Sequence, residues 1–151
     1  MKSLVFDAGP IISLAINNLL FILEPLKNVF NGSFLITDSV RRELVDKPLE
    51  IKKFKFEAIQ VQKLIDDKII EVIDDKEIIE KSQILLNKAN EIYKAYNNYI
   101  KIVHFAEMSV IAAALKLNSS AIGVDEKTTR LLMEDPKIIA EILRRNLQTP
   151  I

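Results

Sequence analysis

The chain lacks cysteine altogether, and it contains only three glycines and one histidine among its 151 residues. Without cysteine, disulfide bonds and thiolate zinc sites are excluded, and this composition fits the reducing environment of the cytoplasm. With three glycines, the sequence offers no glycine-rich loop of the kind that cradles nucleotide phosphates. A nucleotide-binding or phosphatase function therefore has little support.

Long apolar runs are also missing. Glu24 and Pro25 interrupt the longest early candidate, Leu19 to Leu23, and no stretch approaches the roughly 18–20 residues that a transmembrane helix needs. The N-terminus does not combine a basic start, an apolar stretch and a small-residue cleavage site, as a signal peptide does. We therefore expect no membrane association and a cytoplasmic location.

Neither sign of charge is in excess, because 21 basic and 21 acidic residues give a net charge of zero. A general attraction to nucleic acid is thus absent, and any binding of a polyanion must come from a local basic patch. The apolar content of 49% is enough for one domain with a hydrophobic core.

Short apolar runs alternate with helical patterns along the chain. The runs predicted as strands are Leu4–Phe6, Phe34–Ile36, residues 68–73 and Ala121–Val124. Helices are predicted over residues 11–20, 20–30, 40–45, 76–99, 107–117, 128–133 and 138–147. This alternation favours an α/β fold in which helices cover both faces of a mainly parallel sheet, as a single domain over residues 1–151.

Four acidic residues lie where apolar runs end or begin. Asp7 and Asp125 follow predicted strands directly, Glu43 follows the second strand after a short polar stretch, and Glu107 opens the apolar stripe of a helix. Sites in open α/β sheets form at the carboxyl ends of the strands, so we expect these carboxylates to converge. An oxygen-only cluster suits Mg²⁺ or Mn²⁺, which can activate water for phosphodiester cleavage.

Each acid also has an ordinary explanation. Glu43 can belong to a solvated face beside Arg41 and Arg42, Glu107 can favour the first turn of its helix, and Asp125 can cap the helix that follows. The residues alone leave both interpretations open.

Four segments resemble motifs of the PIN-domain nucleases, and they occur in that family's order. They are residues 5–15 around Asp7, residues 35–44 around Glu43, residues 106–114 around Glu107 and residues 122–130 around Asp125. The resemblance implies a three-layer α/β/α domain with a central, mainly parallel sheet. It also implies a metal-dependent ribonuclease in which these four acids are the catalytic residues and hold Mg²⁺ or Mn²⁺.

Family members include toxins of toxin–antitoxin pairs and RNA-processing nucleases, often as homodimers. By resemblance the substrate is RNA, and the expected partners are a second copy of the chain and an antitoxin protein. The alternative is a non-catalytic PIN-like module that binds protein or RNA. A flap-nuclease-like DNase is also compatible with the metal chemistry. The C-terminal end, residues 147–151, is predicted to be shortened relative to archaeal relatives of this kind.

The sequence departs from the family pattern at two positions. A small polar residue commonly lies two places after the first acid and hydrogen-bonds to it, but here that position is Gly9. Ser13 is then the candidate partner for Asp7. The third acid is Glu107, where many members have Asp and some have Glu.

Several further residues have two explanations each. Arg41, Arg42 and Arg130 can bind RNA phosphates or pair with nearby acids. Thr128 can lie in the outer metal shell or cap a helix. His104 can touch metal or substrate, although a structural or solvated role is favoured.

Two groups of aromatic residues also allow two explanations each. Lys52, Lys53 and Lys55 alternate with Phe54 and Phe56, a pattern that suits single-stranded nucleic acid but is better explained by phenylalanines facing the core. Three tyrosines share helical spacing and favour a packing or dimer surface over a base-stacking platform; they are Tyr93, Tyr96 and Tyr99.

Overall fold

The computed structural model describes residues 2–51 and 53–151, so Lys52 of the basic-aromatic pattern lies outside the described residues. Its centre is a parallel four-stranded sheet with the order β3-β2-β1-β6. The strands are β1 (Ser3–Phe6), β2 (Ser33–Thr37), β3 (Glu71–Ile73) and β6 (Ala121–Gly123). The predicted α/β fold with a central parallel sheet is therefore confirmed.

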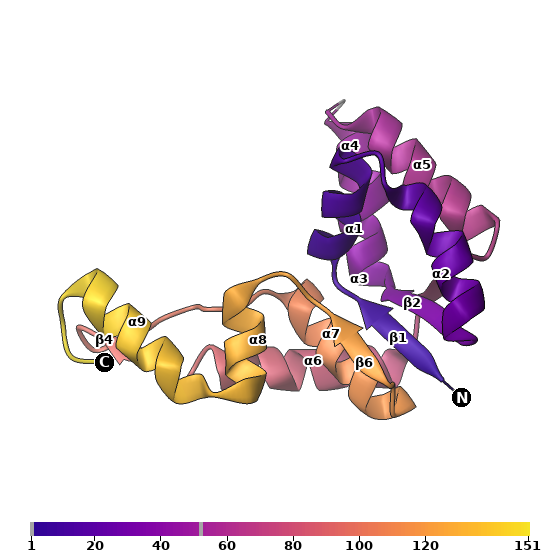
Figure 1. The fold of residues 1–151 in the computed structure, drawn as a ribbon. Helices are drawn as coiled ribbons and strands as arrows, with labels where there is room; N and C mark the ends of the chain where they lie inside the picture. The colour runs from indigo at the N-terminus through magenta and orange to yellow at the C-terminus, as the bar shows by residue number, and fades with distance from the viewer. Residues whose placement is uncertain (1, 52) are drawn as a thin grey trace.

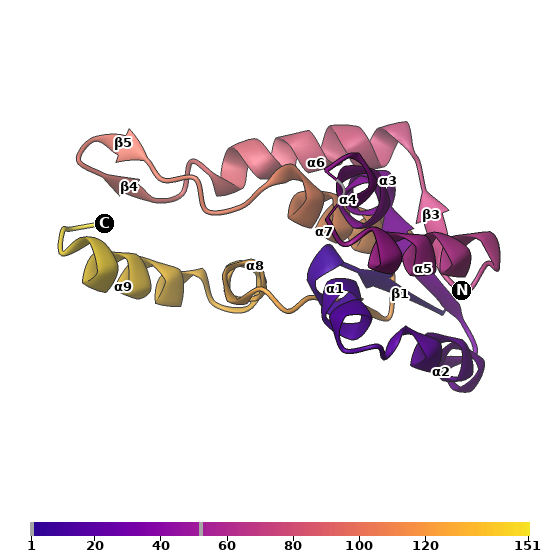
Figure 2. The ribbon, with the colours of Figure 1, turned by 90° about the horizontal axis from the view of Figure 1, so that it is seen from above.

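Helices cover both faces of this sheet, as parallel strands require. Helices α1 (Ala8–Ile16) and α2 (Leu23–Phe30), with a short 3₁₀ turn at Leu20–Ile22 before α2, lie across the sheet from α6 (Lys76–Ala89) and α7 (Phe105–Leu117) (Figures 1 and 2). Asn31 ends α2 in the left-handed conformation, with φ of 52°.

One helical stretch follows β2 and is not uniform. It begins with α3 (Asp38–Arg41), continues as a π-helical segment, Arg42–Asp46, and ends with α4 (Lys47–Glu50). Helix α5 (Lys55–Asp66) then leads to β3. Because π-helical turns are rare and are often found at functional sites, the segment that contains Glu43 is of particular interest.

The main core lies between the sheet and its helices. Strand β2 is buried along its whole length, and Phe34 packs against Phe6 edge to face, with ring centroids 5.3 Å apart. Val5, Ile11 and Ile36 are also fully buried in this cluster. This core fixes the carboxyl ends of β1 and β2, and therefore the places where Asp7 and Glu43 enter the structure.

The predicted helix over residues 76–99 is wrong in its second half. Helix α6 ends at Ala89, and an antiparallel hairpin follows, formed by β4 (Lys94–Ala95) and β5 (Asn98–Tyr99). The three tyrosines therefore do not share a helical face. Tyr93 is buried, whereas Tyr96 is 75% exposed and Tyr99 is 57% exposed.

The hairpin and the C-terminal helices extend away from the sheet (Figure 2). We call the hairpin together with α8 (Lys127–Glu134) and α9 (Pro136–Leu147) the arm. A separate apolar cluster centred on Tyr93, Leu131 and Ile139 holds the arm together.

The preference for core-facing phenylalanines in the basic-aromatic pattern is also wrong, because Phe54 is 50% exposed and Phe56 is 65% exposed. In the part of the chain that the structure describes, no single helix is both long enough and apolar enough to span a membrane. Residues 8–16 and 20–30 meet the length and composition limits only as a pair bent by 117°.

Candidate functional site

A cavity of about 900 Å³ lies where β1 and β2 end and α7 begins. Its lining includes acidic side chains from separate segments of the chain: Asp7, Asp38, Glu43, Asp74, Asp75, Glu107, Asp125 and Glu126. Among the residues that the structure describes, the arginine and lysine side chains on this lining are Arg42 and Lys47. The structure thus brings the four acids singled out in the sequence to one strongly acidic cavity.

Asp7 is the most buried of these acids, with 6% of its surface exposed. Its backbone N–H donates to Gly123 O at 2.8 Å, which ties the end of β1 to β6. The pKa of the Asp7 carboxyl is raised from 3.8 to about 6. Burial is the largest cause, a hydrogen bond from the Ala8 backbone opposes the shift, and the charges of Glu107, Glu43 and Asp125 add to it. A metal ion would relieve the cost of this buried charge.

Asp125 lies directly against the start of α1. A Cβ at Gly9 would come within 1.8 Å of Asp125 Oδ1, so only glycine leaves room for this carboxylate. The Ser13 hydroxyl donates to Asp125 Oδ2 at 3.5 Å. Ser13 is therefore a partner of Asp125 and not, as expected, of Asp7. This contact explains why Gly9 replaces the small polar residue of the family pattern: the Asp125 carboxylate occupies the space that its side chain would need.

Glu43 is part of the π-helical segment, and its Oε1 lies 3.7 Å from Lys47 Nζ. The neighbouring Leu44 and Val45 are buried, which anchors the segment to the core. A π-helical turn accommodates an extra residue and so changes the face on which the following side chains lie. The sequence gives no signal for such a turn, since its apolar pattern resembles that of an ordinary helix.

Glu107 bends back over the start of its own helix. Its Oε2 accepts a hydrogen bond from the His104 N–H, as in a capping box. Burial raises the pKa of Glu107, the His104 hydrogen bond lowers it, and the charges of Glu126 and Glu43 raise it. Glu107 therefore caps the first turn of α7, which is the ordinary explanation offered for it, and it also lines the acidic cavity.

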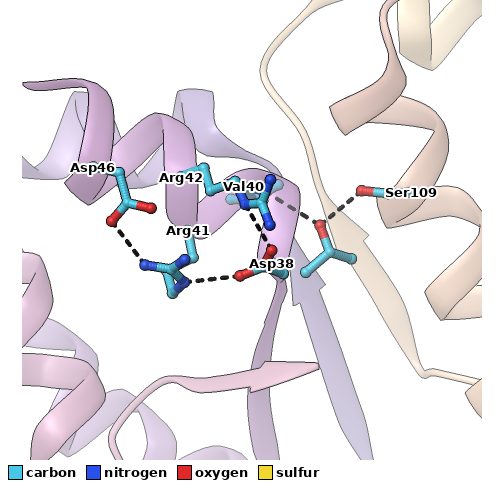
Figure 3. Close-up of polar contacts among 7 residues, drawn as sticks. Asp38, Val40, Arg41, Arg42, Asp46 and Ser109 are labelled. Carbon is cyan, nitrogen blue, oxygen red and sulfur yellow. Dashed lines mark hydrogen bonds and ion pairs between the residues drawn. The ribbon is translucent and has the colours of Figure 1, made fainter. Parts of the chain in front are cut away.

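Buried hydroxyls on the lining of the cavity connect the second and third motifs, and Figure 3 shows the contact that Ser109 makes. The Ser109 hydroxyl donates to Ala106 O at 2.6 Å, so its single proton is committed. The 2.7 Å contact between Thr37 Oγ1 and Ser109 Oγ must then use the Thr37 proton. Thr37 Oγ1 in turn accepts from Val40 N–H at 3.4 Å. This directed chain joins the end of β2 to the first turn of α7.

Asp38 is the centre of a second polar cluster. Arg41 bridges Asp38 and Asp46 at 2.9 and 2.8 Å, and Arg42 Nε lies 2.8 Å from the other Asp38 oxygen (Figure 3). These carboxylates raise the pKa of Arg41. Arg42 is 66% exposed and lines the cavity, so it can exchange Asp38 for a phosphate.

The other residues expected to bind substrate lie elsewhere. Arg41 is engaged by two carboxylates and does not line the cavity. Arg130 lines a different hollow beside β6, and its Nε lies 3.7 Å from Glu134. Thr128, in the first turn of α8, does not line the acidic cavity either.

Four acids on the lining were missed as candidates: Asp38, Asp74, Asp75 and Glu126. Asp38 follows β2 and Asp74 follows β3 immediately, in the same relation that Asp7 has to β1. The strand-end rule used for Asp7 would have identified Asp38 and Asp74.

The donor set on the cavity fits a hard divalent cation, because it consists of carboxylate oxygens and includes a buried, charge-repelled Asp7. Within residues 2–51 and 53–151, however, no group of three or more acidic, histidine or cysteine side chains is close enough to hold one ion. The capping bond of Glu107 and the Ser13 contact of Asp125 are local alternatives to such a cluster.

Comparison with known families gave one match. A family model described as a PIN domain matches residues 3–139, a range that contains all four acids and the whole sheet. Comparisons with curated proteins and with solved structures gave no significant match.

Proposed function

Since the chain belongs to the PIN-domain family, whose members are generally nucleases, we propose that it is a metal-dependent ribonuclease. The observation that carries the proposal is the convergence of four carboxylates from four separate segments on one cavity. Asp7, Glu43, Glu107 and Asp125 are the proposed catalytic residues and the proposed ligands of Mg²⁺ or Mn²⁺. The role is that of a toxin of a toxin–antitoxin pair or of an RNA-processing nuclease.

When bound, such ions supply an activated water and stabilise the charge of the phosphodiester during its hydrolysis. The chain's own residues have distinct tasks around that chemistry. Asp7 is a buried carboxyl whose pKa of about 6 leaves it partly protonated near that pH, and the binding of a cation would displace this proton to solvent. Arg42 and Lys47, at the rim of the acidic cavity, are suited to bind phosphate oxygens of the RNA.

The test is cleavage of a single-stranded RNA in Mn²⁺ by the wild type, with and without EDTA, and by Asp7→Asn. We expect cleavage by the wild type alone, with the loss in Asp7→Asn at least about a hundredfold. Glu80→Gln is the matched control, because it neutralises an exposed acid of α6 that does not line the cavity. Equal loss in Glu80→Gln, or cleavage that persists in EDTA, would contradict the proposal.

A second candidate function is a non-catalytic module that binds RNA or protein. It is favoured by the absence of an ion-holding group of three acids among the described residues, and by the engagement of Glu107 in capping α7. Calorimetry with Mn²⁺ separates the two candidates. Binding that Asp7→Asn abolishes supports the nuclease, whereas no binding at all supports the module.

Homodimerisation, an antitoxin partner and a cytoplasmic location remain predictions from the resemblance and composition. The same holds for the single domain over residues 1–151.

A further inference from the structure

The hairpin β4–β5 has an unusual local composition. From residue 92 to residue 106 the chain contains no aspartate or glutamate, although acids make up 21 of its 151 residues. The same stretch contains Lys94, Lys101 and His104. A protein without net charge that acts on a polyanion needs such a local basic region, because its acidic cavity repels the substrate.

The turn of the hairpin holds an aromatic residue in a strained conformation. Tyr96 and Asn97 form the two-residue loop and have φ of 49° and 64°, as a type I′ turn requires. Asparagine tolerates this left-handed conformation, but a bulky tyrosine adopts it at a cost. Tyr96 is nevertheless 75% exposed, so packing of its ring does not compensate the strain. Strain of this kind is concentrated at functional positions.

The same hairpin carries a second exposed ring. Tyr99 is paired across the hairpin with Lys94, whose Nζ is 5.0 Å from the centroid of the Tyr99 ring. Exposed aromatic rings next to lysines are the features with which proteins bind single-stranded nucleic acid, since bases stack on the rings and phosphates contact the cations.

The hairpin is also connected to the acidic cavity. A hollow of about 430 Å³ is lined by Tyr99, Lys101, His104 and Phe105, together with Glu91 and residues of α6. His104 and Phe105 line the acidic cavity as well, so the two hollows adjoin at the start of α7. A nucleic-acid strand that lies along the hairpin and in this hollow would therefore reach the acidic cavity.

We propose that the β4–β5 hairpin and the adjoining hollow bind the single-stranded RNA that enters the acidic cavity. Tyr96 and Tyr99 stack on its bases, and Lys94 and Lys101 contact its phosphates. This proposal rests on the proposed ribonuclease function for the identity of the substrate, but the binding it describes requires neither metal nor cleavage.

The test is the affinity for a fluorescein-labelled oligouridylate of about 12 nucleotides, measured by fluorescence anisotropy in EDTA. Tyr96→Asn is the most informative variant, because it removes the ring and places in the turn a residue that favours the left-handed conformation. We expect a thermal midpoint equal to or above that of the wild type and an affinity that is lower by roughly fivefold or more.

Further variants separate the ring from the charge. Tyr99→Ala should weaken binding by a similar factor, and Tyr99→Phe should restore most of it because the ring is kept. The double variant Lys94→Gln with Lys101→Gln should reduce the slope of log affinity against log salt by about 1 to 2, as expected for the loss of two phosphate contacts.

Matched controls lie at a distance from the hairpin. Phe21→Ala removes a ring that is 71% exposed beside α2, and Lys63→Gln with Lys68→Gln removes two exposed lysines in α5 and in the turn that follows it. We expect these controls to bind RNA as the wild type does. Equal affinities of the folded tyrosine variants and the wild type, or equal losses in the controls, would overturn the proposal.

Two other results would also overturn it. One is loss of self-association in the tyrosine variants with unchanged RNA affinity, which would make the hairpin a protein contact. The other is equal affinity for the matching oligodeoxyuridylate and the RNA, which would remove the assignment to RNA. If binding depends on the hairpin but no RNA is cleaved in Mn²⁺, the ribonuclease proposal fails and the binding site stands.

Discussion

At the scale of single residues, the acidic cavity depends on the close approach of Asp125 to Gly9. Asp125 occupies the space that any Cβ at Gly9 would fill, so the identity of residue 9 decides where the fourth acid lies. Asp7 is set apart by burial, which raises its pKa to about 6 while the other cavity acids lie nearer the surface. The metal-free protein therefore carries its least favourable charge at Asp7.

This raised pKa makes stability depend on pH in a definite direction. The folded protein holds the Asp7 proton more tightly than the unfolded chain does, so the stabilising contribution is present at low pH and is lost as the pH rises through about 6. Asp7→Asn stays neutral and should gain stability over the wild type between about pH 4.5 and about pH 7.5, by roughly 3 kcal/mol at most.

Urea denaturation in EDTA measures this difference. The exposed Glu80→Gln variant controls for a general change in net charge and should show no comparable trend. A constant difference between Asp7→Asn and the wild type across this range would refute a raised pKa.

At the scale of elements, the helix after β2 and helix α7 must keep a fixed distance for Glu43 and Glu107 to share one cavity. The hydroxyl chain from Val40 through Thr37 and Ser109 to Ala106 provides this connection, and Figure 3 draws the part between Val40 and Ser109. The π-helical segment then determines the direction from which Glu43 reaches the lining. The hydroxyl chain contains no acid, although it affects where Glu43 and Glu107 lie.

Removal of either hydroxyl should leave a buried polar group without its partner. We expect Thr37→Val and Ser109→Ala each to lower the free energy of unfolding by about 1–3 kcal/mol, and the double variant to lose less than the sum. Thr37→Ser keeps the hydroxyl and should lie closer to the wild type. Urea denaturation of the four variants gives the coupling energy, and strict additivity would show that the two hydroxyls act independently.

At the scale of the whole molecule, the main core beneath the sheet and the cluster of the arm are distinct. Phe34 and Ile11 belong to the first, whereas Tyr93 and Ile139 belong to the second. The Tyr93 hydroxyl also donates to Pro136 O, which fastens the start of the hairpin to the start of α9. The hairpin is thus positioned by the C-terminal helices and not by the sheet.

Ile139→Ala tests this division. Ile139 is 4% exposed, and its truncation should cost about 2–5 kcal/mol within the arm. In hydrogen exchange we expect faster exchange in α8, α9 and β4–β5, with little change in β1 and β2. The same variant should bind the oligouridylate more weakly, although it alters no proposed RNA contact. Uniformly faster exchange over the whole chain would mean that the arm and the sheet unfold as one unit.

Much of this architecture could be predicted because it depends on local patterns. Runs such as Leu4–Phe6 and Phe34–Ile36 are short, apolar and bounded by turn signals, so they indicate buried parallel strands. The residues that follow them then lie at one edge of the sheet. The hairpin was missed because its isoleucines and tyrosines continue the helical spacing of α6, while the tight turn at Tyr96 and Asn97 lacks glycine.

The sequence by itself determined the fold class and the family, and it indicated four acids that line one cavity, because strand ends and family motifs are properties of neighbouring residues along the chain. Only the tertiary structure decided which side chains meet. In the structure, Ser13 hydrogen-bonds to Asp125 instead of Asp7, and Arg41 and Arg130 lie outside the acidic cavity. The hollow beside the hairpin adjoins that cavity. These outcomes depend on contacts between residues up to 112 positions apart, as for Ser13 and Asp125, and no local pattern encodes such distances.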